Sequence, residues 1–221
     1  MTPSLRKFAL TIHITLSVGW IGAVLAYLVL VVAAMTSPNA QTLRTAWIAM
    51  ELIGFYLIVP LALTSLLSGL FMALGTPWGL FKHYWVLVSL ALTIFATIIL
   101  LQHMQTVTFF ARVATGLVSD DVAALRGALR GELLHAGVGL MVLLLIEALN
   151  VYKPQGMTAY GRRQASSFAL PSHPSGRLKS SPRLGYSGTM PRWVQAVGIH
   201  VVGLAILFVI VHLAGGGLRQ H

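Results

Sequence analysis

The chain has 221 residues, of which 57% are hydrophobic and only 9% carry a charged side chain. Soluble globular domains contain about 25% charged residues, so this composition excludes a soluble fold and predicts an integral membrane protein. The formal net charge of +10 does not indicate nucleic-acid binding, because the basic residues lie between apolar stretches, where they contact anionic lipid headgroups. The absence of cysteine excludes disulfides, iron–sulfur clusters and covalently attached haem, and leaves imidazole, carboxylate, thioether and backbone groups as ligands.

Five apolar stretches are long enough to cross a bilayer, which takes about 20 helical residues. They are residues 8–35, 46–74, 84–113, 133–152 and 193–214. We expect the first to be a retained span, because it is longer than the apolar region of a signal peptide. The predicted fold is therefore all-α, an integral membrane helical bundle with five transmembrane helices. A four-helix core occupies residues 1–152, and residues 193–221 supply the fifth helix and a tail.

The sequence also predicts the structure of two connections between these stretches. Residues 115–130 are expected to connect the third and fourth spans, with Asp120 and Asp121 capping a short helix. Residues 153–192 are rich in Ser, Pro, Gly and Arg and contain no acidic residue. Such a composition predicts a basic, disordered loop that lies on the membrane surface.

The distribution of basic residues predicts the orientation in the membrane. Cytoplasmic loops carry an excess of Lys and Arg. Placing Arg6, Lys7, Lys82 and the 153–192 loop on the cytoplasmic side puts ten Lys and Arg residues there. Five then remain on the other side: Arg44, Arg112, Arg126, Arg130 and Arg219. The N-terminus is therefore expected in the cytoplasm and the C-terminus outside.

Histidines inside the predicted spans are the main functional signal. Ionisable groups within a membrane usually face the bundle interior or a water-filled cavity. His13 and His200 lie in the cytoplasmic half, and His103 and His135 lie toward the outer half. Two such groups are typical of membrane b-type cytochromes, so we predict that each pair ligates a haem b. The alternative is that each histidine is hydrogen-bonded within ordinary helix packing.

The first span carries a polar and aromatic stripe. His13, Ser17, Trp20, Val24 and Tyr27 follow one another at offsets of four, three, four and three, so they share one helix face. Gly19 and Gly22 allow close approach beside Trp20. An imidazole, an indole and small residues on one face suit the edge of a porphyrin, which makes Trp20 a predicted cofactor contact. The alternative is an ordinary helix interface that Trp20 fills.

A carboxylate and a histidine stand together at the start of the fourth span. Glu132 and His135 are three residues apart, so they lie on one helical turn. Three interpretations remain open: a ligand histidine oriented by a carboxylate, a proton-handling pair, or an ion pair at a helix start.

Two segments resemble a loose group of small bacterial membrane proteins. The group includes the HemJ-type protoporphyrinogen oxidases and the membrane domain of CopD-type copper-resistance proteins. Residues 13–22, with His13, Trp20 and a nearby glycine, resemble its first-span signature. Residues 78–90, followed by His103, resemble its third-span entry, although Ser89 stands where the HemJ pattern has lysine. The resemblance covers roughly the first 150 residues.

The resemblance implies a b-type haem with His13 as ligand, or copper handling, in a bacterial cytoplasmic membrane. The leading prediction is a multi-pass protein of that membrane that binds haem b and transfers electrons or acts on a porphyrin or quinone. One alternative is a copper or other metal transport or tolerance protein, which the scattered methionines do not favour. The other is a non-catalytic subunit or assembly factor of a membrane complex, with partner proteins and lipids as its contacts. Whether the protein is an enzyme stays open.

Overall fold

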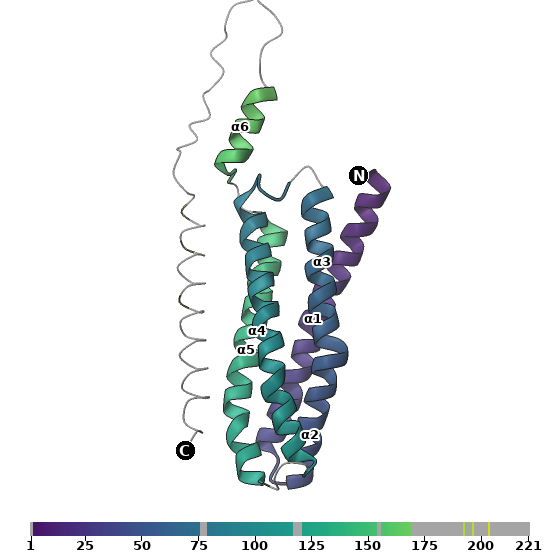
Figure 1. The fold of residues 1–221 in the computed structure, drawn as a ribbon, viewed down its shortest axis with the longest axis vertical. Helices are drawn as coiled ribbons and strands as arrows, with labels where there is room; N and C mark the ends of the chain where they lie inside the picture. The colour runs from purple at the N-terminus through teal and green to yellow at the C-terminus, as the bar shows by residue number, and fades with distance from the viewer. Residues whose placement is uncertain are drawn as a thin grey trace, which may run out of the picture.

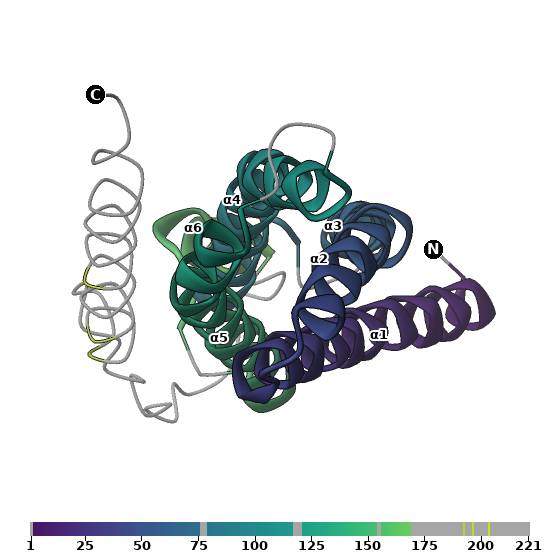
Figure 2. The ribbon, with the colours of Figure 1, turned by 90° about the horizontal axis from the view of Figure 1, so that it is seen from below.

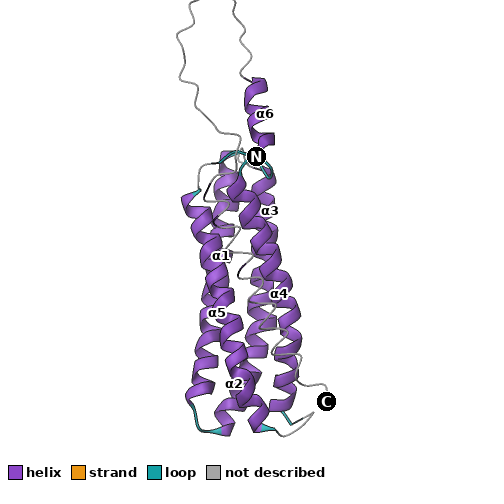
Figure 3. Ribbon diagram, turned by 90° about the vertical axis from the view of Figure 1, so that its left-hand side faces the viewer, coloured by secondary structure: helices purple, strands orange, loops and turns teal. Residues whose placement is uncertain are grey.

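The computed structural model describes residues 2–75, 79–116, 121–153 and 156–168, together with residues 192, 196 and 203. Within this part of the chain, four helical segments are long and apolar enough to cross a membrane, and no strand is present (Figure 3). The prediction of an all-α, multi-pass membrane fold is therefore confirmed. The predicted fifth span at 193–214, with His200, lies outside the described residues except for residues 196 and 203.

The first helix is longer than a bilayer crossing requires. α1 (Pro3–Thr36) has proline in its first turn, where a missing N–H group is tolerated, and the Thr2 side chain accepts a hydrogen bond from the Leu5 N–H at 3.4 Å. Its 34 residues correspond to about 51 Å, which exceeds the roughly 30 Å hydrocarbon core. Its ends therefore extend beyond that core.

The second span is one continuous helical rod with an internal π-helical turn. It consists of α2 (Ala40–Ile53), η1 (Gly54–Ile58) and α3 (Val59–Gly75). Pro60 explains the widened turn, because it lacks an N–H group and its ring would clash with the carbonyl of Tyr56 in a regular α-helix. Gly54 lies against Met104, whose Cε would be 2.5 Å from a Cβ atom added at this glycine. The missing side chain of Gly54 therefore allows the second span to lie close to α4.

The remaining spans are α4 (Tyr84–Ala114) and α5 (Val122–Tyr152). α5 begins eleven residues before the predicted start of the fourth span, so most of the predicted 115–130 connection is helical. The Asp121 carboxylate caps this helix by accepting from the Ala124 N–H at 2.8 Å. The expected short helix continues into the span because Leu125 and Leu129 are buried on the same face as Glu132.

Two ends of the bundle differ in how tightly they are packed. α1 packs against α3 and α5, and α4 packs against the same two helices, so the spans enclose a common interior (Figures 1 and 2). At the end where α1 finishes and α2 begins, the interior is fully closed by residues of 0–1% exposure: Val31, Leu43, Trp47, Val107, Leu125 and Leu129. At the N-terminal end, α1 leans away from α5 (Figure 2). Before Trp20, Ala9 is the single buried residue among the described part of α1.

The segment after α5 is docked onto the loop before α4. The Tyr84 N–H donates to the Gly156 carbonyl at 3.2 Å, and the Thr158 N–H donates to the Lys82 carbonyl at 2.9 Å. The Thr158 hydroxyl accepts from the Gly161 N–H at 3.1 Å, which caps α6 (Ala159–Phe168). Residues 156–168 thus differ from the expected disorder of the 153–192 loop, because backbone hydrogen bonds hold them. Residues 169–191 lie outside the described residues.

Candidate functional sites

Two cavities lie along the predicted stripe of α1. The first, which we call the His13 cavity, opens near the N-terminal end and is lined by His13, Ser17 and Trp20 from α1. The second, the His103 cavity, lies deeper and is lined by Trp20, Val24 and Tyr27 from the same helix. The stripe predicted from the sequence therefore faces the interior, and Trp20 forms part of both walls.

The His13 cavity is the larger and the more polar of the two. Its volume is about 400 Å³, within the roughly 300–1,000 Å³ of small-molecule sites, whereas the His103 cavity has about 100 Å³. Polar side chains also come from the other spans, and they include Ser65, Ser89, Thr93, Glu147 and Asn150. Arg6 and Lys153, at the ends of their helices, complete the lining. A ligand that is apolar inside and anionic at the mouth would match this cavity.

A hydrogen-bond chain fixes the tautomer of His13. Its Nδ1 lies 2.9 Å from the Ser68 Oγ, and the Ser68 hydroxyl donates its own proton to the Ser65 carbonyl at 3.0 Å. With the Ser68 proton on the Ser65 carbonyl, the Ser68 oxygen accepts from His13, and the neutral ring then carries its proton on Nδ1 and a lone pair on Nε2. Histidines that ligate metals are held in this way, through a hydrogen bond from the other ring nitrogen. Gly69 lets the ring lie against α3, since a Cβ there would be 3.1 Å from His13 Cε1.

A buried hydroxyl without a partner faces the same cavity. Ser89 is 6% exposed, and its Oγ has no hydrogen bond within the described segments. Leaving such a group unpaired costs roughly 1–3 kcal/mol, so buried hydroxyls are nearly always paired in folded proteins. The Ser89 hydroxyl can therefore form a hydrogen bond with a molecule in the cavity.

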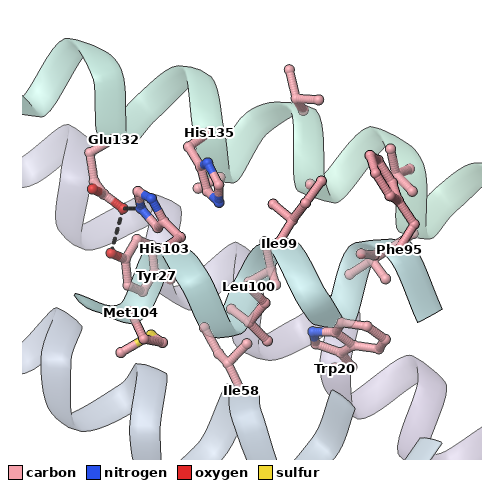
Figure 4. Close-up of a pocket in the computed structure, with 17 residues that line it drawn as sticks. Trp20, Tyr27, Ile58, Phe95, Ile99, Leu100, His103, Met104, Glu132 and His135 are labelled. Carbon is pink, nitrogen blue, oxygen red and sulfur yellow. Dashed lines mark hydrogen bonds and ion pairs between the residues drawn. The ribbon is translucent and has the colours of Figure 1, made fainter. Parts of the chain in front are cut away.

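The His103 cavity ends at a compact polar network (Figure 4). The Tyr27 hydroxyl donates to Glu132 Oε1 at 2.6 Å, and His103 Nε2 lies 2.8 Å from the same oxygen. His135 stacks on His103 with ring centroids 3.5 Å apart and an interplanar angle of 12°. Glu132 is only 3% exposed, so its carboxyl group is shielded from the surroundings of the bundle. The network joins α1, α4 and α5.

In a bilayer centred on α4 and α5, this network lies inside the hydrocarbon region. Glu132 is ten residues from the start of α5, and His103 is eleven from the end of α4, which places both about 15 Å from the helix ends. Each helix has 31 residues, about 47 Å, so both side chains lie roughly 6 Å inside a 30 Å core. An acidic side chain there costs about 2.5–3.5 kcal/mol unless it is compensated. The two hydrogen bonds to Glu132 provide that compensation.

The predicted ligand residues that the structure describes lie in two different cavities. His103 and His135 are in contact, as their predicted pairing requires, but their geometry does not fit a haem iron between them. A metal lies about 2 Å from an imidazole nitrogen and in the plane of the ring, whereas these two rings meet face to face. In the part of the chain that the structure describes, no group of three or more His, Asp or Glu residues is placed to hold a metal ion. His13 lies in the other cavity, and its predicted partner His200 is outside the described residues.

Two functional contacts were not predicted. The predicted stripe includes Tyr27 but not its hydrogen bond to Glu132. No role was predicted for Ser68. A signal for Ser68 exists in the sequence, because Ser65 and Ser68 are three residues apart in an otherwise apolar span. No protein-family model matches this chain, and no curated protein or solved structure is matched to it. The resemblance to the HemJ-type and CopD-type proteins therefore stays a prediction.

Proposed function

We propose that this protein binds a haem b in the His13 cavity, with His13 Nε2 as an iron ligand, and transfers electrons or acts on a porphyrin or quinone. The single observation that carries the proposal is the Ser68 hydrogen bond, which leaves the Nε2 lone pair of His13 as the ligand atom in a cavity of about 400 Å³. We place the protein in a bacterial cytoplasmic membrane with its N-terminus inside, as its basic residues suggest.

The residues of the cavity suit the parts of a haem. Trp20 and Trp85 offer flat apolar contact to a porphyrin ring. Arg6 and Lys153 are suited to the two propionates, since Arg6 is seven residues, about 10 Å, from His13 along α1. When bound, the haem would supply one-electron redox chemistry. The chain would hold the ring, neutralise its carboxylates and exclude water.

An optical spectrum tests this proposal. A purified and reduced sample should show the visible bands of a b-type haem, with iron in stoichiometric amount. His13→Ala should bleach or shift those bands, whereas the matched variant His103→Ala, in the other cavity, should leave them in place. A colourless, folded protein would overturn the proposal. Copper or zinc without stoichiometric iron would favour metal transport or tolerance instead.

A further inference from the structure

The Tyr27–Glu132–His103–His135 network is not used by the proposed haem site. Tyr27 comes from α1, His103 from α4, and Glu132 and His135 from α5. Among the described residues that line this cavity, these four are the titratable ones, and the second span contributes only apolar Ile58. The protonation of the network is therefore set by these side chains and by what enters the cavity.

The hydrogen-bond geometry limits how many protons the network can hold. A proton must lie between His103 Nε2 and Glu132 Oε1 for their 2.8 Å contact to be a hydrogen bond. If that were the only proton on the pair, a neutral imidazole would face a carboxylate, and the network would carry one uncompensated negative charge within the membrane. One more proton makes the pair neutral overall, as imidazolium with carboxylate or as imidazole with carboxylic acid. A second extra proton would give the network a net positive charge inside the membrane, next to the stacked ring of His135.

The network is reached from the His103 cavity, whose lining includes the exposed Phe95 as well as buried residues. Trp20 and Leu143 line both cavities, so the His103 cavity adjoins the wider His13 cavity at these two side chains. On the other side of the network, Val31, Val107 and Leu129 are 0–1% exposed and close the interior. A volume of about 100 Å³ is large enough to admit water, which occupies roughly 10–15 Å³ per molecule.

We propose that Glu132 and His103 form a proton-binding site inside the membrane, which takes up one proton from the His103 cavity. A hydronium ion in the His103 cavity transfers its proton to the Glu132–His103 pair and leaves as water, so the pair changes from a net charge of −1 to neutral. The site is independent of haem, and the ligand is the proton itself.

Infrared spectroscopy of the full chain in lipid nanodiscs tests the bound proton. At pH 7, the spectrum of the wild type minus that of Glu132→Gln should show either a carboxylic acid band or an imidazolium band. That band should shift when H₂O is replaced by D₂O. Glu51→Gln, a carboxylate change outside both cavities, should leave that band in place. Tyr27→Phe keeps the pair and should shift the band without removing it, which keeps the test usable if Glu132→Gln does not fold. Bands of an ionised carboxylate with a neutral imidazole would overturn the proposal.

The rate of deuterium exchange tests the route. Gly139 lines the His103 cavity and a Cβ there would meet no atom within 4 Å, so Gly139→Leu should fill the cavity without disturbing the network. We expect it to slow exchange of the bound proton at least tenfold. Gly137→Leu, two residues away and not part of either lining, is the matched control and should exchange at the wild-type rate. Equal rates for the two variants would overturn proton uptake through the His103 cavity.

Discussion

The two cavities share a helix face but differ in whether their polar groups are satisfied. In the His103 cavity, the Tyr27 hydroxyl and His103 Nε2 both bond to Glu132 Oε1. In the His13 cavity, the Ser89 hydroxyl has none among the described residues, and the cavity is about four times larger. The groups of the completed network bond to one another, whereas the unpaired hydroxyl can bond to a ligand. The predictions below test this contrast between the two cavities.

The largest expected effect comes from removing Glu132. Glu132→Ala leaves the Tyr27 hydroxyl and the His103 ring without their buried partner, and breaking such a buried pair costs about 3 kcal/mol. Thermal unfolding in detergent should show a strongly lowered midpoint.

Ser89→Ala is the matched contrast in the other cavity. Because the Ser89 hydroxyl has no partner to lose within the described chain, this variant without added haem should be as stable as wild type or slightly more stable. A loss of stability as large as that of Glu132→Ala would remove the distinction between the two cavities.

The next effect concerns ligand affinity in the His13 cavity. Ser68→Ala removes the acceptor that holds the His13 tautomer, and such outer-shell changes lower metal affinity by about 10–100-fold. Haem titration followed by absorbance measures this change. Thr64→Ala, on the exposed face of the same helix, is the control and should bind haem like wild type. Equal affinities for the two variants would mean that Ser68 does not orient an iron ligand.

A smaller effect should follow from crowding beside the π turn. Gly54→Ala places a methyl group against Met104, which lines the His103 cavity, and should destabilise the fold by about 1 kcal/mol. Gly22→Ala meets no atom within 4 Å and should stay within about 0.5 kcal/mol of wild type. Combining Gly54→Ala with Met104→Ala should abolish the cost of the alanine at 54. If this cost persists, the π turn itself, and not the contact with Met104, disfavours a side chain at position 54.

The smallest expected effect is a pH dependence at the junction of α6 with the 79–84 loop. Burial, and then the positive charge of Lys82, lower the pKa of His83 below its usual 6.5. The docked state therefore favours the neutral ring, so its stability is full above about pH 6.5 and falls as pH drops from there toward the lowered pKa. Hydrogen exchange of the 156–162 amides, corrected for intrinsic rates, should show weaker protection at pH 5.5 than at pH 7.5. His83→Gln should flatten this difference, and an unchanged difference would assign it to another group.

The spans were predictable because hydropathy alone identifies about 20 apolar residues in a row. The contact of His103 with His135 was also predictable in outline, because short connections make the third and fourth spans neighbours. The pairing of Tyr27 with Glu132 was not, since it depends on which face of α1 meets α5 and at which height. The same holds for Ser68 and His13, which are 55 residues apart in the chain. Helix periodicity gives the face of each residue, but the relative translation of two helices follows from packing of the whole bundle.

Trp20 has a consequence for the protein as a whole, because one indole borders both cavities. A ligand that displaces this ring on one side changes the space and the electrostatics on the other. Thermodynamic linkage then requires reciprocity: if occupancy beside His13 alters proton affinity at Glu132 by some factor, protonation must alter ligand affinity by the same factor. A single aromatic side chain would thus be sufficient to couple two binding equilibria in this bundle without any movement of its helices.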